Sequence, residues 1–435
     1  MTITVTAVAD LGLEARGALF DRDAGIDAAR ADAREIVERV REEGDVAVRE
    51  FTREFDDVAV GNLEITDDCE RAVDDIDPDV RAAIDTAIDN VREFHAAQLP
   101  EDWRREFDDG RELGRRFRPL ERVGVYVPGG TAAYPSSAIM GIVPAVVAGV
   151  DHVVAVTPPA ERINPVTLAA IHLAGADAVY SVGGAQGIAA LAYGTETVTP
   201  VQKIVGPGNR WVTAAKAEVR EAVEIDLLAG PSEVVVIADG TANPAHVAAE
   251  LLAQAEHDPN ASVVAVTDDA DLADAIAAAV DDQVSERARE ETIREALSSD
   301  ASAILHARSM SEAILFTEEY APEHLTIIAD DGDDEAILER IDSAGSVFLG
   351  PHTPVAAGDY ASGTNHVLPT NGGAKVTGGL SVDHFLRATT VQRLSDGGLA
   401  DLGPAITTLA EAEGLEAHAE SVRVRLDDAG ERGSE

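Results

Sequence analysis

From Val123 onward, the sequence alternates short runs of Val and Ile with Gly/Pro turns and Ala-rich segments of helical length. Chains with this alternation form βαβ units, in which parallel strands build a sheet that helices cover. The expected strands form two series, at 123–127, 153–156, 178–182 and 203–205, and at 234–237, 263–266, 325–328 and 347–349. The sequence therefore predicts an α/β fold.

The two series of expected strands resemble each other at a constant spacing. Residues 125–132 read VYVPGGTA and align with VVIADGTA at 235–242, while VVAVT at 153–157 recurs at 263–267. Both matches have the same offset of 110 residues, and a shared offset favours an internal duplication. We therefore expect two similar, incomplete Rossmann-like βαβ domains with a crevice between them.

Helical regions are expected on both sides of these domains. Apolar residues at helical spacing, near 23–50 and 77–97, predict a mainly helical N-terminal region. The segment after Leu380 has the pattern of amphipathic helices and is too short to form a domain alone, so we expect it to pack on another structure, of which a second protomer is one possibility. The predicted divisions are a helical N-terminal region 1–122, a first Rossmann-like domain 123–230, a second one 231–379 and a C-terminal helical tail 380–435.

The excess of acidic residues excludes several classes of partner. The chain has 80 acidic and 34 basic residues, a formal net charge of −46, and three lysines, at Lys203, Lys216 and Lys375. Such a charge repels nucleic acid and anionic membranes. Because the acidic residues are spread along the chain, we interpret them as a surface adaptation to a salt-rich cytoplasm.

Cysteine usage and the N-terminus bound the cellular location. The single cysteine, Cys69, excludes an intrachain disulfide framework and a cysteine zinc finger. The N-terminus lacks the basic and apolar regions of a signal peptide, and no stretch approaches about eighteen uninterrupted apolar residues. The sequence predicts a soluble cytoplasmic protein without a membrane partner.

Three glycine-rich turns each follow an expected strand and precede an expected helix. They read VPGG at 127–130, VGGAQ at 182–186 and VGPGN at 205–209. Backbone can approach a phosphate closely at such turns, and the N-terminus of a helix favours anions. None of the three contains a complete G-x-G-x-x-G, so the spacing is equally compatible with a dinucleotide site and with ordinary tight turns.

Candidate metal ligands occur in three separate segments. Gln254 and His257 lie three residues apart near the end of a helix expected from Pro244, so both can face one metal ion. Asp359 lies in a stretch rich in glycine and small polar residues, expected to be a loop, and His418 lies on the C-terminal tail. Read singly, each is also compatible with an ordinary surface role. Together they form a mixed nitrogen and oxygen set that suits Zn²⁺ or Mn²⁺.

An adjacent acid and base, Glu323 and His324, open the expected strand near 325–328. Histidine accepts protons at neutral pH, and a glutamate beside it can activate water. Adjacent pairs of this kind are common on protein surfaces, so the pair alone does not identify a catalytic site.

Together these segments resemble the histidinol dehydrogenase family, over about 122–418. IDLLAGPSE at 225–233, continuing to QAEH at 254–257, is similar to the family's signature, and GDYASGTNHVLPT at 358–370 matches its pattern. The resemblance implies a zinc-containing enzyme that oxidises L-histidinol to L-histidine through L-histidinal with reduction of two NAD, the last step of histidine biosynthesis. It also implies a homodimer with shared active sites.

The resemblance further implies roles for individual residues. Glu323 and His324 would be catalytic, with His324 as the base in both oxidations and Glu323 activating water in the second. The implied zinc ligands are Gln254, His257, Asp359 and, from the other subunit, His418. The implied substrate contacts are Ser232, His366 and Glu413. The implied NAD contacts are Tyr126, Gln186 and Asn209.

Other functions remain compatible with the same residues. A sibling dehydrogenase of the same fold could oxidise another small alcohol with a similar zinc set. A zinc hydrolase could use these ligands with Glu323 as its base and without NAD. A non-catalytic, salt-adapted binding protein would require the polar candidates in separate segments to occur by coincidence.

Overall fold

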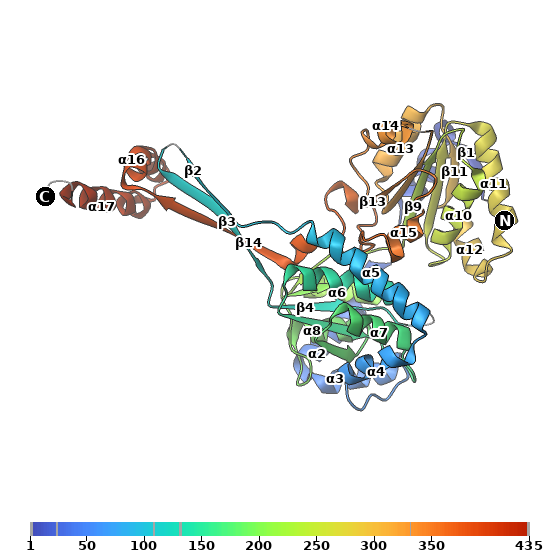
Figure 1. Cartoon of the computed structure of the whole chain (residues 1–435), viewed down its shortest axis with the longest axis horizontal. Helices are drawn as coiled ribbons and strands as arrows, with labels where there is room; N and C mark the ends of the chain where they lie inside the picture. The colour runs from blue at the N-terminus through green and yellow to red at the C-terminus, as the bar shows by residue number, and fades with distance from the viewer. Residues whose placement is uncertain (1–2, 23–24, 108, 130–132, 331, 433–435) are drawn as a thin grey trace. The chain divides into compact units, whose positions relative to one another are not determined.

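The computed structural model describes residues 3–22, 25–107, 109–129, 133–330 and 332–432. The chain divides into two compact units, of which the first comprises Met1–Gln98 with Leu120–Phe385 and the second Leu99–Pro119 with Leu386–Glu435. The first unit contains two parallel sheets, and the second contains an antiparallel sheet and two helices (Figure 1). None of the helices in the described ranges is long and apolar enough to cross a membrane.

The first sheet of the large unit consists of five parallel strands in the order β6-β5-β4-β7-β8. In chain order they are β4 (Arg122–Tyr126), β5 (His152–Thr157), β6 (Ala178–Ser181), β7 (Lys203–Val205) and β8 (Glu224–Ile225). The connecting helices are α6 (Pro135–Ala148), α7 (Pro165–Ala174), α8 (Gly184–Tyr193) and α9 (Arg210–Val219). Each connection between neighbouring parallel strands thus passes through a helix, as the βαβ pattern predicted.

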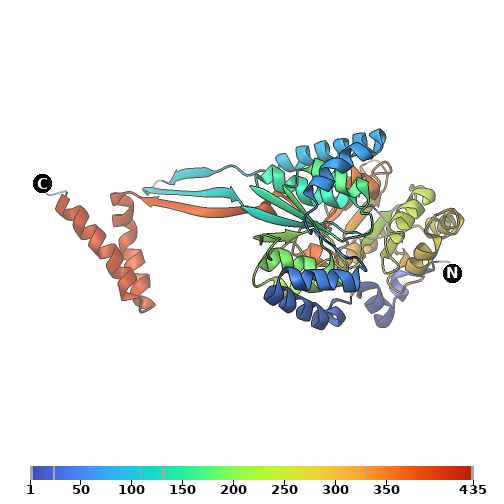
Figure 2. The ribbon, with the colours of Figure 1, turned by 90° about the horizontal axis from the view of Figure 1, so that it is seen from below.

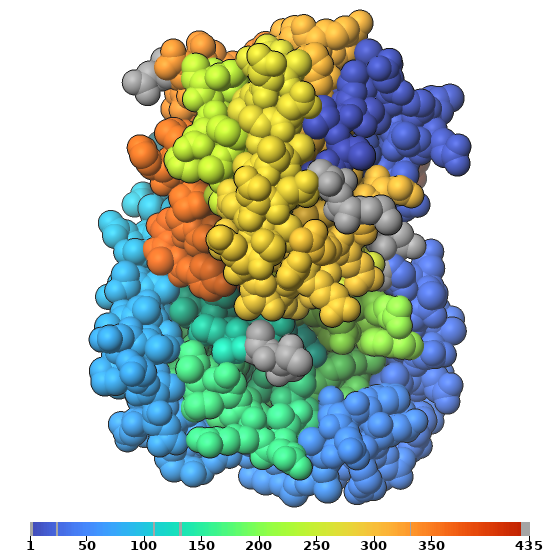
Figure 3. All heavy atoms as spheres, turned by 90° about the vertical axis from the view of Figure 1, so that its right-hand side faces the viewer, coloured from blue at the N-terminus to red at the C-terminus, as the bar shows by residue number. Residues whose placement is uncertain are grey.

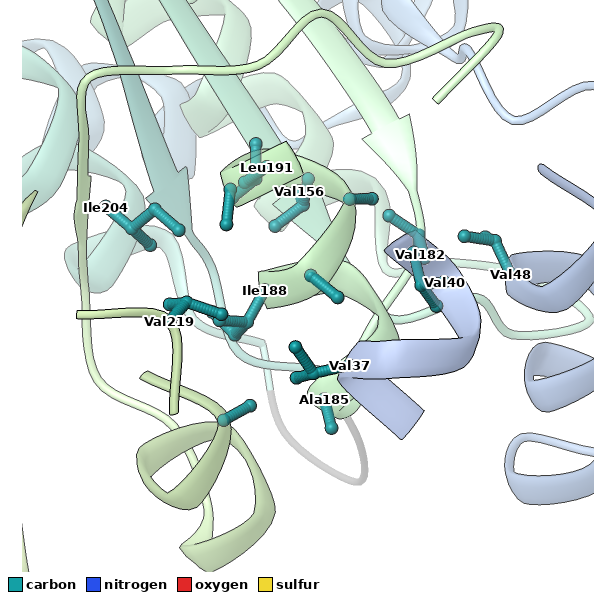
Figure 4. Packing of buried hydrophobic residues seen from close by; sticks show 14 of the residues in the cluster. Val37, Val40, Val48, Val156, Val182, Ala185, Ile188, Leu191, Ile204 and Val219 are labelled. Atoms are coloured by element: carbon teal, nitrogen blue, oxygen red, sulfur yellow. The ribbon is translucent and has the colours of Figure 1, made fainter. Parts of the chain in front are cut away.

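Small apolar side chains allow helices to pack closely on this sheet. On one face α8 and α9 lie against α2 (Ile26–Glu43) and α3 (Asp45–Phe55); on the other, α6 and α7 lie against α4 (Thr66–Asp75) and α5 (Pro78–Ala96). Val37 and Val40 of α2 gather with Ala185 and Ile188 of α8 in one buried cluster (Figure 4). This core positions the turns that follow β4, β6 and β7.

The second sheet consists of six parallel strands in the order β1-β11-β10-β9-β12-β13. These are β1 (Val5–Ala7), β9 (Glu233–Ala238), β10 (Ser262–Thr267), β11 (Ala303–His306), β12 (His324–Ile328) and β13 (Ser346–Leu349). One face is covered by α10 (Pro244–Ala255), α11 (Ala270–Val284) and α12 (Glu290–Leu297), and the other by α1 (Leu13–Phe20), α13 (Met310–Tyr320) and α14 (Asp333–Leu338). Because β1 pairs with β11, the dark-blue N-terminal residues lie beside yellow and orange ones in Figure 3. The remaining short elements are α15 (Val355–Tyr360) and the 3-10 helices η1 (Val8–Asp10), η2 (Gly373–Lys375) and η3 (Val382–Phe385).

The two sheets share one strand order. When β4 is matched with β9, the orders β6-β5-β4-β7-β8 and β11-β10-β9-β12-β13 coincide, and β1 extends the second sheet. β5 and β10 begin at His152 and Ser262, 110 residues apart, which is the offset of the sequence matches. All eight predicted strands are present, so the prediction of an α/β fold with parallel sheets is confirmed. Gly130, Thr131 and Ala132 of the proposed repeat lie outside the described residues.

The small unit differs from the sequence-based expectation. Its antiparallel strands are β2 (Trp103–Phe107), β3 (Arg111–Pro119) and β14 (Leu386–Leu394), and its helices α16 (Asp396–Ala412) and α17 (Glu416–Arg432) pack on each other (Figure 2). A mainly helical region was predicted for 1–122 and a helical tail for 380–435, and neither prediction included these strands. The β-branched run Thr389, Thr390 and Val391 favours an extended strand, and β14 pairs with β3 over its whole length.

Candidate active site

Glu323 and His324 lie at the amino end of β12, in the interior of the second sheet. Glu323 immediately precedes the strand and His324 is its first residue, as the sequence predicted. Glu323 is only 6% exposed and His324 only 4%. β12 pairs with β9 and β13 on its two sides, and His324 lies opposite Val234 of β9. The pair is therefore a buried acid and base beside the start of β9.

The main chain of Glu233, the first residue of β9, holds both members of this pair. Its N–H donates to Oε2 of Glu323 at 2.9 Å, and its carbonyl oxygen lies 3.0 Å from Nδ1 of His324. Because a carbonyl oxygen can only accept, Nδ1 carries the proton of this hydrogen bond. In the neutral ring, Nε2 is then the atom that can accept a proton. Nε2 is buried and has no hydrogen-bond partner among the described residues.

The side chain of Glu233 is itself anchored by a buried ion pair. Its Oε2 accepts from Nη1 of Arg22 at 2.6 Å, and its Oε1 accepts from the N–H of Asn371 at 2.6 Å. Arg22 also donates to the carbonyl of Tyr320 at 3.0 Å, with its guanidinium 4.0 Å from the centroid of the Tyr320 ring. The two ion-paired side chains are 4% and 0% exposed. Burial raises the pKa of Glu233, and the charge of Arg22 opposes this shift.

Asp359 completes the group of titratable side chains around His324. It lies in the last full turn of α15, a short helix. The sequence predicted a loop here, but Val355, Ala356 and Ala357 form a helical turn that extends up to Asp359. Oδ1 of Asp359 is 3.6 Å from Nε2 of His324. Its carbonyl oxygen accepts a hydrogen bond from Nδ1 of His366 at 3.1 Å.

The charges of this group shift its pKa values in opposite directions. Burial by itself would lower the pKa of His324, but Glu323 and Asp359 outweigh burial and raise the pKa to about 10. Burial acts to raise the pKa of Asp359, but the close approach and the charge of His324 bring it below its ordinary value. Burial lowers the pKa of His366. The arrangement is thus an imidazolium between two carboxylates, beside a neutral imidazole.

Gln254 and His257 lie at the end of α10, as the sequence predicted. Gln254 is buried in the last turn of the helix, whereas His257 is exposed two residues beyond its end. The N–H of His257 donates to the carbonyl of Gln254 at 3.2 Å, so one hydrogen-bonded turn joins them. The charge of His257 also helps to lower the pKa of Asp359. Within the described ranges, no group of three or more His, Cys, Asp or Glu side chains is arranged to hold a metal ion.

The remaining predicted metal ligand and substrate contacts are divided between the two units. Ser232 immediately precedes β9 and its carbonyl accepts from the N–H of Ser262 at 3.0 Å. Glu413 is the exposed C-cap of α16, and His418 is exposed in the first turn of α17. These two residues belong to the small unit, whereas the other predicted site residues belong to the large unit.

A cavity of about 1300 Å³ opens at the carboxyl ends of the strands of the first sheet. It is lined by all three predicted NAD contacts: Tyr126 ends β4, Gln186 lies in the first turn of α8, and Asn209 precedes α9. The Tyr126 hydroxyl accepts from the N–H of Gly184 at 3.1 Å, which fixes the turn after β6. Oε1 of Gln186 is buried without a hydrogen-bond partner in the described part of the chain, so it is an acceptor without a donor.

Asp56 lines the same cavity and was not predicted. It follows α3, lies 3.4 Å from Nε2 of Gln186, and burial raises its pKa to about 6. No motif surrounds Asp56, so no sequence pattern distinguishes it from the other acidic residues among the 80 in the chain. Asn209 also has a structural role, because its Oδ1 accepts from the N–H groups of Trp211 and Val212 and caps α9.

Comparison with known proteins shows which family this chain resembles. The histidinol dehydrogenase family profile matches residues 21–426. A histidinol dehydrogenase from Haloarcula marismortui is 69% identical over 425 residues, covering 98% of this chain and 100% of the relative. One from Halobacterium salinarum is 68% identical over 422 residues, covering 97% of this chain and 99% of the relative. A crystal structure of histidinol dehydrogenase from Elizabethkingia anophelis has a TM-score of 0.92 at 37% identity, covering 98% of this chain and 99% of that one.

Proposed function

Because this chain belongs to the histidinol dehydrogenase family and is an oxidoreductase, we propose that it oxidises L-histidinol to L-histidine through L-histidinal in the cytoplasm. NAD would accept a hydride in each of the two oxidations. The observation that carries the proposal is the buried pair of Glu323 and His324, bound by both main-chain groups of Glu233 beside Asp359. A sibling dehydrogenase for another small alcohol is not favoured, because the relatives that match the whole chain are histidinol dehydrogenases.

The hydrogen bonds of the pair give each residue a separate task. Since Nδ1 of His324 donates to the carbonyl of Glu233, Nε2 is the atom that accepts the hydroxyl proton of the substrate. Oε2 of Glu323 already accepts the N–H of Glu233, which leaves Oε1 to take a proton from the water that adds to the aldehyde. We assign substrate contacts to Ser232, His366 and Glu413.

We further propose a zinc ion bound by Gln254, His257, Asp359 and His418 of the partner subunit in a homodimer. The donor set fits, because an amide oxygen, a carboxylate and two imidazoles suit Zn²⁺ with room for substrate atoms, and Asp359 interacts electrostatically with His257. The cation would orient the substrate's imidazole and amine and would offset the charge of Asp359, so that His324 could release its proton at neutral pH. Mn²⁺ would suit the same donors.

For NAD, we propose the cavity at the carboxyl edge of the first sheet, where Tyr126, Gln186 and Asn209 contact the dinucleotide. Numbered along the chain within this sheet, its strands lie in the order 3-2-1-4-5, which is the order of the first five strands of a Rossmann domain. The turns before α8 and α9 lie at this edge. We propose that both sheets arose by internal duplication, with an NAD domain at 123–230 and a catalytic domain at 231–379. Residues 380–435 would pack on the partner subunit.

The acid excess fits a salt-adapted source, as the organisms of the two similar relatives suggest. At a net charge of −46, low salt leaves repulsion between surface carboxylates poorly screened. The assay must therefore be carried out in concentrated salt.

The test is NADH formation from L-histidinol in high salt, before and after treatment with a chelator. The proposed function predicts two NADH per histidinol consumed, with activity lost on chelation and restored by Zn²⁺ or Mn²⁺. Production of one NADH with the aldehyde as final product would show a single alcohol oxidation. Absence of NADH with histidinol, in protein shown to be folded, would refute the assigned substrate.

A further inference from the structure

A buried ion pair outside the proposed catalytic group joins α9 to the segment after β8. Nζ of Lys216 lies 2.6 Å from Oδ1 of Asp226, and the two side chains are 4% and 1% exposed. Lys216 is one of three lysines in a chain that otherwise uses arginine as its long basic residue. A buried ion pair is costly to desolvate and adds little net stability, so its position needs another explanation.

The pair binds both polar main-chain groups of Gly206. Lys216 Nζ donates to the carbonyl of Gly206 at 2.6 Å, and the N–H of Gly206 donates to Oδ2 of Asp226 at 2.7 Å. Gly206 has φ of +109°, and a Cβ there would lie 2.3 Å from the carbonyl oxygen of Tyr126. Gly206 opens the turn that leads to Asn209. The pair therefore fixes the turn against the end of β4 at the proposed NAD cavity.

The same carboxylate also fixes the start of the segment that leads to the catalytic sheet. Oδ1 of Asp226 accepts from the N–H of Leu227 at 2.6 Å. Further along, Thr213 of α9 donates to the carbonyl of Ala229 at 3.2 Å, and the N–H of Gly230 donates to Oγ1 of Thr370 at 2.6 Å. This segment ends at β9, whose first residue holds Glu323 and His324. One ion pair thus contacts both the nucleotide turn and the chain leading to the acid and base.

We propose that Lys216 and Asp226 are positioning residues for dinucleotide binding, which act by holding Gly206 and the turn 206–209. This inference rests on the proposed use of NAD. A lysine suits the position, because a compact ammonium can donate to a carbonyl and a carboxylate in different directions. The planar guanidinium of an arginine has a fixed fork and a larger volume. Because the Lys216 side chain is only 4% exposed, its site cannot accommodate this larger group without a shift of the turn.

The decisive variant replaces both partners, Lys216→Met with Asp226→Leu, so that no uncompensated charge is left inside. Affinity for NADH is measured by fluorescence titration in high salt, and kcat and KM are measured with NAD and histidinol. We expect NADH binding and KM for NAD to weaken by about tenfold, because the turn loses its fixed position, with a smaller change in kcat at saturating NAD. Lys375→Met, which removes the exposed lysine that donates to the Glu319 carbonyl, is the matched control and should bind NADH normally.

Lys216→Arg gives a second test in case the double variant does not fold, since it retains the charge. It should also weaken NADH binding more than Lys375→Arg does. A folded double variant, or a folded Lys216→Arg, with the parent's affinity for NADH would overturn the positioning role. Failure of the unmodified protein to bind NADH would instead refute the proposed use of NAD.

Discussion

Replacing Arg22 with methionine tests whether the buried ion pair with Glu233 positions the catalytic residues. The guanidinium contacts Oε2 of Glu233 at 2.6 Å and the carbonyl of Tyr320 at 3.0 Å. Methionine retains much of the apolar stem of Arg22 but neither donor. The carboxylate of Glu233 then loses its cation, while its side chain remains buried with only the N–H of Asn371 as a donor.

The expected loss of stability follows from this burial. Removing one partner of a buried ion pair costs about 3–5 kcal/mol, because the other charge is left uncompensated. At about 2.1 cal/mol/K per residue, the 435-residue chain has an unfolding entropy of about 0.9 kcal/mol/K, so about 4 kcal/mol lowers Tm by about 4 °C. Burial already raises the pKa of Glu233, and loss of Arg22 raises it further. A raised carboxyl pKa means that the folded state binds the extra proton, so the deficit is smallest near pH 5 and grows towards pH 8.

The assay combines thermal unfolding at several pH values with steady-state kinetics in high salt. Because the backbone of Glu233 holds Glu323 and His324, we expect kcat to fall by about tenfold with little change in KM for histidinol. The control is Arg16→Met, which removes an exposed ion pair with Glu319 and should cost at most about 1 kcal/mol. An Arg22→Met variant with the parent's Tm and kcat would refute the argument, and so would a stability deficit that shrinks as the pH rises.

Three further predictions concern separate parts of the site. Glu323→Gln should slow oxidation of histidinal more than oxidation of histidinol, whereas His324→Ala should slow both; stopped-flow NADH traces distinguish the two, and normal aldehyde oxidation by Glu323→Gln would exclude water activation by Glu323. Burial raises the pKa of Asp56 to about 6, so its contribution to the unfolding free energy falls as the pH rises from about 4 to about 6. Asp56→Asn should flatten the plot of unfolding free energy against pH over that range, and an unchanged plot would contradict this. Deleting the residues after Leu380 should abolish bound zinc and activity together, as measured by elemental analysis, and a truncated chain that still binds zinc tightly would refute the shared site.

Much of the fold was predictable, because strong periodic patterns specify buried parallel strands. Runs of Val and Ile bounded by Gly and Pro predicted eight strands, all of which are present. β8 contains two residues, too few to give a pattern, and β1, at the start of the chain, was not predicted; each pairs with one neighbouring strand, which supplies its hydrogen bonds. β14 was mistaken for helix because its pairing with β3, more than 260 residues earlier in the chain, cannot be seen in the local sequence.

The residues that carry the chemistry of the candidate site were more predictable than the residues that hold them in position. Glu323, His324 and Asp359 belong to residue types that move protons or bind cations, and the resemblance selected them. The contribution of Glu233 comes mainly from its main-chain N–H and carbonyl, which every residue except proline possesses, so no side-chain pattern predicts it. Arg22 contacts Glu233 across 211 positions of sequence, and Asp56 becomes notable only through its burial.

The two sheets place their candidate functional groups at opposite edges, although they share a strand order. In the first sheet, Tyr126, Gln186 and Asn209 lie at the carboxyl ends of the strands, where the N-termini of α8 and α9 favour an anion such as a pyrophosphate. In the second sheet, Glu323 and His324 lie at the amino ends, where the first residue of a neighbouring strand offers a free N–H and carbonyl. Those two groups fix a carboxylate and the tautomer of an imidazole, which proton transfer requires and phosphate binding does not. The same architecture can therefore serve nucleotide binding at one edge and acid–base chemistry at the other, and strand order alone does not identify which edge a sheet uses.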